Sequence, residues 1–203
     1  MLTVGLAGGS GSGKGTVSNL FRDYGIKSIN TDAVYHDLTS PGGACIAPLV
    51  AEFGKDILNS DGSLNRPALF ESVFSSDDMP DRKEKLQSIT HGLILQKVRD
   101  ILSKMEKSGV PAVLVDAPLL FESGFDRECD LIISVIADTD IRIRRIMCRD
   151  GITQENAKKR IESQLSDDFL SKNSDFIIIN NGDCESLYGK VQSIAEFILK
   201  RGK

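Results

Sequence analysis

The feature that most constrains this sequence is a run of glycines between an apolar segment and a helical pattern. Residues 5–17 read GLAGGSGSGKGTV, in which five of the first nine residues are glycine. The apolar residues 3–7 predict a short buried strand. The spacing of Val17, Leu20 and Phe21 predicts a helix over 14–23. A strand, a glycine loop and a helix in succession favour the βα unit of a parallel sheet.

The remaining chain continues this alternation of strands and helices. Further strands are expected over 26–30, 112–115, 131–136 and 176–179, and helices over 33–38, 44–53, 81–107, 138–149, 153–165 and 185–200. Continuously apolar strands predict burial on both faces. The expected fold is α/β, a doubly wound sheet of about five parallel strands with helices on both faces. The glycine stretch, Asp32 and Asp116 follow the carboxyl ends of strands, where such sheets bind ligands.

Composition excludes several classes of function. The 203 residues are enough for one domain with an insertion. The formal charge of −4 gives no reason to expect a nucleic-acid partner, so local positive features must hold any anionic ligand. The four cysteines form no CxxC pair and are expected to be free thiols. No apolar run reaches the roughly 20 residues of a membrane span, and a cytoplasmic protein without a membrane partner is expected.

The residues Gly8–Lys14 match the pattern GxxxxGK. Glycines permit the backbone dihedrals that turn consecutive N–H groups inward around a polyphosphate. The following helix adds its positive end, and Lys14 supplies a mobile charge for the β- and γ-phosphates. The structural alternative is a glycine-rich turn without a ligand. The complete spacing, together with the lysine and both flanking elements, favours nucleotide binding through Gly11, Ser12, Gly13, Lys14, Gly15 and Thr16.

One position departs from the motif. Gly15 stands where the pattern has Ser or Thr, so it cannot ligate magnesium, and Thr16 follows it. Thr16 is expected to contact phosphate through its hydroxyl or backbone, and Thr16 and Asp116 are the candidate magnesium residues. Asp116 has two further readings, as a partner of Lys14 or as a solvated strand end.

A kinase also needs a carboxylate beside the acceptor hydroxyl. The chain has no NKxD motif of the kind that GTPases use for guanine. Asp32 is well placed in sequence to be the general base, and the alternative is an N-cap for the helix from residue 33.

A second set of charged residues predicts a lid. Arg142, Arg145 and Arg149 share one helix face. They could neutralise charge on the transferring phosphoryl group, together with Arg160 and Gln164 from the next helix. The alternative is a solvated basic surface.

Several segments together resemble dephospho-CoA kinases, and the resemblance runs from end to end. Besides the loop, the matching segments are INTDAV (29–34), FGKDILNSDGSLNRPAL (53–69), His91, VDAPLLFESGFDRECDLIISV (115–135), RIMCRD (145–150), RIESQ (160–164) and SDFIIINNGD (174–183). The DGSLNR and PLLFESG segments are far more specific than the loop. The family usually has Ser at position 15, often DAD at 30–32, and frequently HP at 91–92, where this chain has Gly15, Asn30-Thr31-Asp32 and His91-Gly92.

The resemblance implies transfer of the ATP γ-phosphate to the ribose 3′-hydroxyl of dephospho-CoA, with magnesium. It implies a P-loop kinase-like core (1–53, 109–137 and 174–203), a helical acceptor-binding insertion (54–108) and a small lid (138–173). It makes Asp32 the base and assigns Lys14, Arg145 and Arg149 to catalysis. The acceptor-side residues that it implies are Asn65, Arg66, His91, Leu119, Phe121 and Glu122, and Gln164 belongs to the lid.

Two other functions remain open on the sequence. The KGT variant of the loop is familiar from nucleoside monophosphate kinases, so a nucleotide acceptor is one alternative. A non-catalytic ATP-binding regulatory module is the other, although retention of Lys14 and Asp32 argues against it. Whether the protein is a monomer or a homo-oligomer is likewise open.

Overall fold

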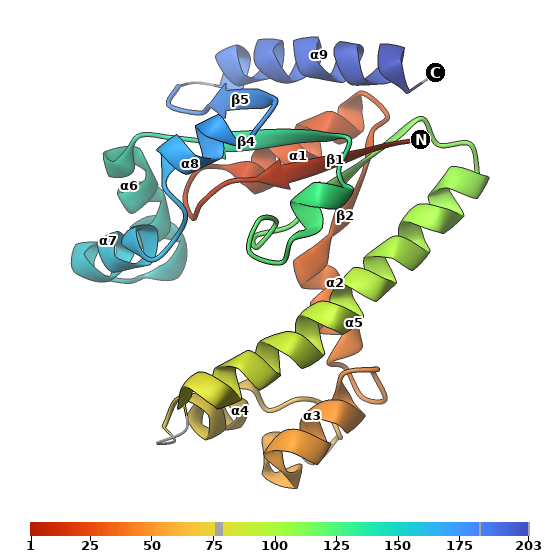
Figure 1. Cartoon of the computed structure of the whole chain (residues 1–203). Helices are drawn as coiled ribbons and strands as arrows, with labels where there is room; N and C mark the ends of the chain where they lie inside the picture. Colours follow the sequence, from red (N-terminus) through yellow and green to blue (C-terminus); the bar gives the residue numbers. More distant parts are fainter. Residues whose placement is uncertain (76–78, 183, 203) are drawn as a thin grey trace. The chain divides into compact units, whose positions relative to one another are not determined.

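Five parallel strands form the centre of the protein in a computed structural model, which describes residues 1–75, 79–182 and 184–202. The strands are β1 (Leu2–Ala7), β2 (Lys27–Asn30), β3 (Ala112–Asp116), β4 (Leu131–Ile136) and β5 (Phe176–Ile179). Their order in the sheet is β2-β3-β1-β4-β5, and every neighbouring pair is parallel (Figure 1). The expected α/β sheet is confirmed.

The two faces of the sheet pack against different parts of the chain. Val4 and Leu6 of β1 join a core with helices α1 (Lys14–Asp23) and α9 (Cys184–Arg201), which pack on each other. The other face of β1 carries Gly5, where an added Cβ would lie 2.9 Å from a methyl carbon of Leu120. The segment after β3 therefore lies directly against that face, and glycine leaves the space for it.

Three more helices follow β4. They are α6 (Thr139–Asp150), α7 (Gln154–Glu162) and α8 (Asp167–Lys172), and a 3₁₀ turn, η2 (Phe125–Glu128), precedes β4. Thr153 caps α7 by accepting a hydrogen bond from the Asn156 amide. Ile146 and Ala157 are fully buried between α6 and α7, so these two helices share a small core of their own.

The chain divides into two compact units, and each is described by itself. The first contains residues 1–30 and the residues from 104 onward, and the second contains residues 31–103. The second unit holds α2 (Thr31–Leu38), α3 (Ile46–Phe53), the 3₁₀ turn η1 (Lys55–Ile57), α4 (Arg66–Phe74) and most of α5 (Met79–Lys107). Its buried apolar residues include Leu49, Ile57, Leu69 and Val73.

Three local differences from the sequence-based elements bear on the site. Helix α4 was not predicted, although Asn65 caps it and Pro67 lies in its first turn. Helix α2 begins at Thr31, so Asp32 lies inside its first turn and is not an N-cap. The expected helix over 153–165 is α7, which ends at Glu162, and α8, which Ser166 caps, was not predicted.

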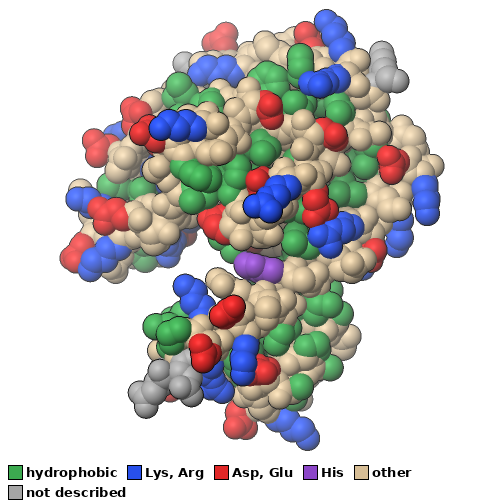
Figure 2. Space-filling view, in the orientation of Figure 1, with side chains coloured by type: hydrophobic (Ala, Val, Ile, Leu, Met, Phe, Trp, Pro, Cys, Tyr) green, Lys and Arg blue, Asp and Glu red, His purple; other side chains and the backbone are tan. Residues whose placement is uncertain are grey.

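The surface carries mixed charge. Figure 2 shows Lys and Arg side chains interspersed with Asp and Glu over the visible face. Among the helices of the described residues, none combines the length and apolarity that crossing a bilayer requires.

Candidate active site

The predicted phosphate-binding loop, Gly8–Lys14, connects β1 to α1. Gly11 and Gly13 have φ of 78° and 91°, in the left-handed region that side chains disfavour. Within the described part of the chain, no side chain caps the amino end of α1. The first-turn N–H groups of α1 therefore remain available to an anion, and the helix dipole favours one there.

At four positions of this loop an added Cβ would lie less than 3.0 Å from a neighbouring atom. An added Cβ at Gly8 would lie 2.6 Å from the Val135 carbonyl oxygen, and one at Gly11 would lie 2.6 Å from the carbonyl oxygen of Arg142. At Gly9 and Gly13 it would collide with the side-chain nitrogens of Arg142 and Asn180 respectively. Gly15 differs, because no described heavy atom lies within 4 Å of an added Cβ. Packing therefore explains the glycines of the loop but not Gly15.

Lys14 and Asp116 form an ion pair at the carboxyl edge of the sheet. The Lys14 ammonium contacts Asp116 Oδ1, and their side chains are 15% and 6% exposed. Asp116 ends β3, in register with Leu6 of β1 and Asn30 of β2. Of the readings considered for Asp116, the structure shows pairing with Lys14. The ion pair with Asp116 therefore keeps the Lys14 side chain at the loop instead of leaving it solvated and mobile.

Three loop carbonyls are held from outside by side chains of distant segments. The Ser10 carbonyl accepts from Arg142 Nε at 2.9 Å, and the Gly11 carbonyl accepts from Arg145 at 3.2 Å. The Ser12 carbonyl accepts from Asn180 Nδ2 at 2.7 Å. In a trans peptide the N–H points opposite to the C=O. Fixing the Ser10 and Ser12 carbonyls therefore turns the amides of the following residues, Gly11 and Gly13, the other way.

Arg142 is the most buried of the lid-region arginines, with 3% of its surface exposed. Its guanidinium also donates to Asp167 Oδ1 at 3.2 Å and to Gln164 Oε1 at 3.3 Å. Burial lowers the pKa of Arg142, and the nearby Asp167 partly opposes this. An arginine nevertheless stays charged in proteins, so a positive charge lies behind the loop.

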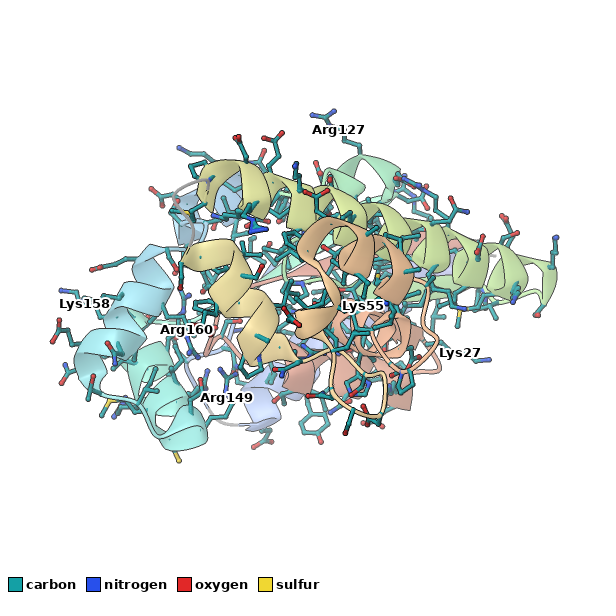
Figure 3. The ribbon with its side chains drawn as sticks, turned by 90° about the horizontal axis from the view of Figure 1, so that it is seen from below. Lys27, Lys55, Arg127, Arg149, Lys158 and Arg160 are labelled. Carbon is teal, nitrogen blue, oxygen red and sulfur yellow. The ribbon has the colours of Figure 1, made fainter. Side chains whose placement is uncertain are left out.

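Arg149 has a different environment at the end of α6. It donates twice to the Asp150 carboxylate, at 2.7 and 2.9 Å, and Arg160 of α7 contacts the same carboxylate. Figure 3 labels both arginines on these neighbouring helices. Hydrogen bonds from Arg149, and then from Arg160, lower the pKa of Asp150 to about 2. The carboxylate thus links α6 and α7 at neutral pH.

The expected acceptor-side residues fall in both units. In the second unit, Asp32 is exposed in the first turn of α2. Asn65 accepts from the Ala68 amide at 3.1 Å, and the Arg66 guanidinium lies 4.9 Å from the centre of the Tyr35 ring. His91 is half-buried in α5.

The other acceptor-side residues belong to the first unit. Leu119 is 44% exposed and Glu122 is exposed. Phe121 packs edge-on against Phe169 of α8, with ring centres 5.3 Å apart. Exposed apolar groups beside a carboxylate leave this segment able to contact a ligand.

Sequence reasoning missed Asn180 and gave Arg142 no individual role. Asn180 directly follows β5 and is buried. The signal that singled out Asp116, a polar residue after a buried strand, was therefore also present at Asn180. Arg142 belonged to the arginine face that was recognised, but its burial depends on contacts with Ser10, Gln164 and Asp167, which no local pattern reveals.

The residues of the loop fit a nucleotide and a magnesium ion. The Ser12 hydroxyl is buried and has no hydrogen-bond partner among the described residues, a costly arrangement unless a ligand or water completes it. No group of three His, Cys, Asp or Glu gathers in the described residues. Magnesium in such sites binds only one or two carboxylates, together with substrate phosphates and water. The Asp116 carboxylate and the exposed Thr16 hydroxyl therefore suit a magnesium ion.

Comparisons with known proteins agree over almost the whole chain. A curated dephospho-CoA kinase of Corynebacterium efficiens is 39% identical over 203 residues, which is 100% of both chains. The solved structure of a dephospho-CoA kinase from Campylobacter jejuni is 25% identical, with a TM-score of 0.73 over 99% of this chain and 98% of that one. A solved Thermus thermophilus structure is 28% identical, with a TM-score of 0.81 over 97% of each chain.

The fold is thus that of the P-loop kinases. The family model described as dephospho-CoA kinase matches residues 2–186. On this match and on the full-length similarity to curated members, the chain belongs to the dephospho-CoA kinase family.

Proposed function

We propose that this protein transfers the γ-phosphate of ATP to the ribose 3′-hydroxyl of dephospho-CoA, which yields coenzyme A and ADP. The observation that carries the proposal is the phosphate-binding loop with its largely buried Lys14–Asp116 pair, in a chain that matches the family over residues 2–186. ATP is the phosphoryl donor that membership of a kinase family implies.

The loop supplies the binding of the donor. Amides of Gly11–Thr16 and the ammonium of Lys14 hold the β- and γ-phosphates, which brings positive charge to the oxygens that become more negative during transfer. Thr16 and Asp116 would hold magnesium, whose charge would further neutralise those oxygens. The proposed catalytic work of the protein is therefore positioning and charge neutralisation.

Asp32 is the proposed general base. The acceptor 3′-oxygen forms a bond to the γ-phosphorus while the bond from that phosphorus to the β–γ bridging oxygen breaks. The hydroxyl proton passes to the Asp32 carboxylate, and ADP leaves with the bridging oxygen. Arg145 and Arg149 are proposed to stabilise the transferring group, which for Arg149 requires that it leave Asp150.

The acceptor is proposed to contact Asn65, Arg66 and His91 from residues 54–108, and Leu119, Phe121 and Glu122 from the segment after β3. Residues 138–173 are proposed to act as the lid. The proposed compartment is the cytoplasm, which the free Cys45, Cys129 and Cys148 support.

An acceptor panel tests the proposed function. ADP release is measured with ATP and magnesium against dephospho-CoA, AMP, CMP, UMP and GMP in separate reactions, with Lys14→Ala as the control for loop-dependent turnover. We expect turnover with dephospho-CoA, and product with phosphate on the 3′-oxygen. Preference for a nucleoside monophosphate would make the protein a nucleotide kinase, and ATP binding without ADP release at any acceptor would make it a regulatory module.

A further inference from the structure

We propose that Arg142 is a positioning residue for phosphoryl transfer, which fixes the phosphate-binding loop from its outer side and ties it to the segment between α7 and α8. The inference rests on the proposed function where it is tested by turnover of dephospho-CoA. Where it is tested by ATP affinity, it rests on nucleotide binding alone. It assigns Arg142 no contact with ATP.

Ser10 is held on both of its backbone groups. Its carbonyl accepts from Arg142 Nε at 2.9 Å, and its amide donates to Gln164 Oε1 at 2.9 Å. The same Gln164 oxygen accepts from the Arg142 guanidinium at 3.3 Å. Arg142 and Gln164 therefore fix the peptide groups on both sides of Ser10, and through them the direction of the Gly11 amide.

The backbone of Arg142 also shapes the loop. An added Cβ at Gly11 would lie 2.9 Å from Arg142 Cα and 2.6 Å from its carbonyl oxygen. An added Cβ at Gly9 would collide with the Arg142 guanidinium. Glycine at positions 9 and 11 thus lets the loop close against α6, in addition to permitting the dihedrals that phosphate binding needs.

Only an arginine has the donors for this arrangement. The guanidinium is planar, and its separate N–H groups reach Ser10, Gln164 and Asp167 at once. A lysine at position 142 would keep the charge but present one compact ammonium on a flexible stem. Replacement of Arg142 by lysine therefore removes the fixed hydrogen-bond geometry while it keeps the positive charge.

Substitution of Arg142 by lysine is the main test. We expect Arg142→Lys to weaken ATP binding and to lower kcat, each by about tenfold, because misplacement of groups by a fraction of an ångström costs rate on this scale. The matched control is Arg144→Lys, an exposed position on the same helix, which should leave both quantities unchanged. ATP affinity is measured by calorimetry, kcat with dephospho-CoA, and the folded fraction by thermal unfolding.

A second substitution keeps the test decisive if Arg142→Lys does not fold. Gln164→Met removes the shared acceptor from an exposed residue, and it should weaken ATP binding in the same direction. In the double variant, the two effects should be less than additive, since both act through Ser10. Wild-type ATP affinity and kcat in folded Arg142→Lys would overturn the proposal, as would wild-type affinity in Gln164→Met if the lysine variant cannot be studied.

Failure of the proposed function would look different. A wild-type protein that binds ATP but does not phosphorylate dephospho-CoA contradicts the function only. The calorimetric comparison of Arg142→Lys with Arg144→Lys still decides whether Arg142 positions the loop. A purely structural role for Arg142 would lower the unfolding temperature while the folded protein bound ATP normally.

Discussion

Gly13 and Gly15 flank Lys14, and their surroundings predict opposite effects of substitution. Gly13 has φ of 91°, and an added Cβ would collide with the Asn180 amide, whereas Gly15 is exposed and has open space around an added Cβ. We expect Gly13→Ala to abolish measurable ATP binding.

Gly15→Ser should raise the free energy of unfolding by about 0.5 kcal/mol, because serine is the better helix former, and should lower the magnesium concentration needed for half-maximal rate. Calorimetric titration with ATP checks Gly13→Ala, and thermal unfolding and magnesium titrations check Gly15→Ser. Destabilisation by Gly15→Ser would contradict the geometry.

Asp32 carries the proposed proton transfer, so its substitution tests chemistry apart from binding. Asp32→Asn removes the proton acceptor while keeping size and polarity in the first turn of α2. We expect kcat to fall by roughly 10²–10⁴-fold with ATP affinity unchanged. Asp37→Asn is the matched control, since Asp37 is exposed on the same helix and has no assigned role. Normal turnover in Asp32→Asn would exclude general-base catalysis by this residue.

Among the secondary-structure elements, the end of α6 and helix α7 are joined by an acid-sensitive contact. Asp150 has a pKa lowered from 3.8 to about 2, first by Arg149 and then by Arg160. A carboxyl whose folded-state pKa is depressed stabilises the protein fully above the unfolded value and loses that contribution as pH falls through the folded value. The stabilising effect of Asp150 should therefore be present above pH 3.8 and disappear toward pH 2.

The Asp150→Asn variant isolates this effect. The stability difference between wild type and Asp150→Asn should shrink as pH falls from about 4 to about 2, measured by denaturant titration at each pH. The carboxyl carbon of Asp150 should titrate near pH 2 in an NMR experiment. Glu162→Gln is the control, because its exposed pair with Lys158 spans 3.9 Å and should contribute little. An ordinary titration of Asp150 near pH 4 would show that the contact does not persist in solution.

The elements also show what sequence alone can predict. The strands were predicted to within about one residue because most of them are apolar runs that the sheet buries. The short β2 is the exception, since Ile29 is its one buried residue. Helix α4 escaped prediction because Phe70 and Phe74 are exposed although Leu69 and Val73 are buried, so no single apolar face marks it. In the site, Lys14 and Asp116 were found from the motif and the strand ends. The contacts of Arg142 and Asn180 with the loop join residues 132 and 168 positions apart, and only the assembled sheet creates them.

For the whole molecule, the division into two units places the proposed donor-binding residues in the first unit and splits the proposed acceptor residues between both. The chain leaves the first unit after Asn30 and returns at Lys104. The phosphate-binding loop and the lid-region helices belong to the first unit, while Asp32, Asn65, Arg66 and His91 belong to the second. The proposed base thus follows the end of β2 by only two residues. ATP is therefore proposed to contact the first unit, whereas dephospho-CoA is proposed to contact both units.

Hydrogen exchange of the intact protein tests which segments ATP and dephospho-CoA contact. A ligand at about 100 times its Kd stabilises the state that binds it by about 2.7 kcal/mol, which slows exchange where local opening must release the ligand. ATP should therefore protect residues 8–17 and the amino-terminal half of α6, through Arg142 and Arg145. Dephospho-CoA should protect residues 31–38, 64–74 and 119–122, and coenzyme A serves as the product control. Protection by dephospho-CoA confined to residues 1–30 and 104–202 would contradict acceptor binding by Asn65, Arg66 and His91, while leaving the assignment of the phosphate-binding loop intact.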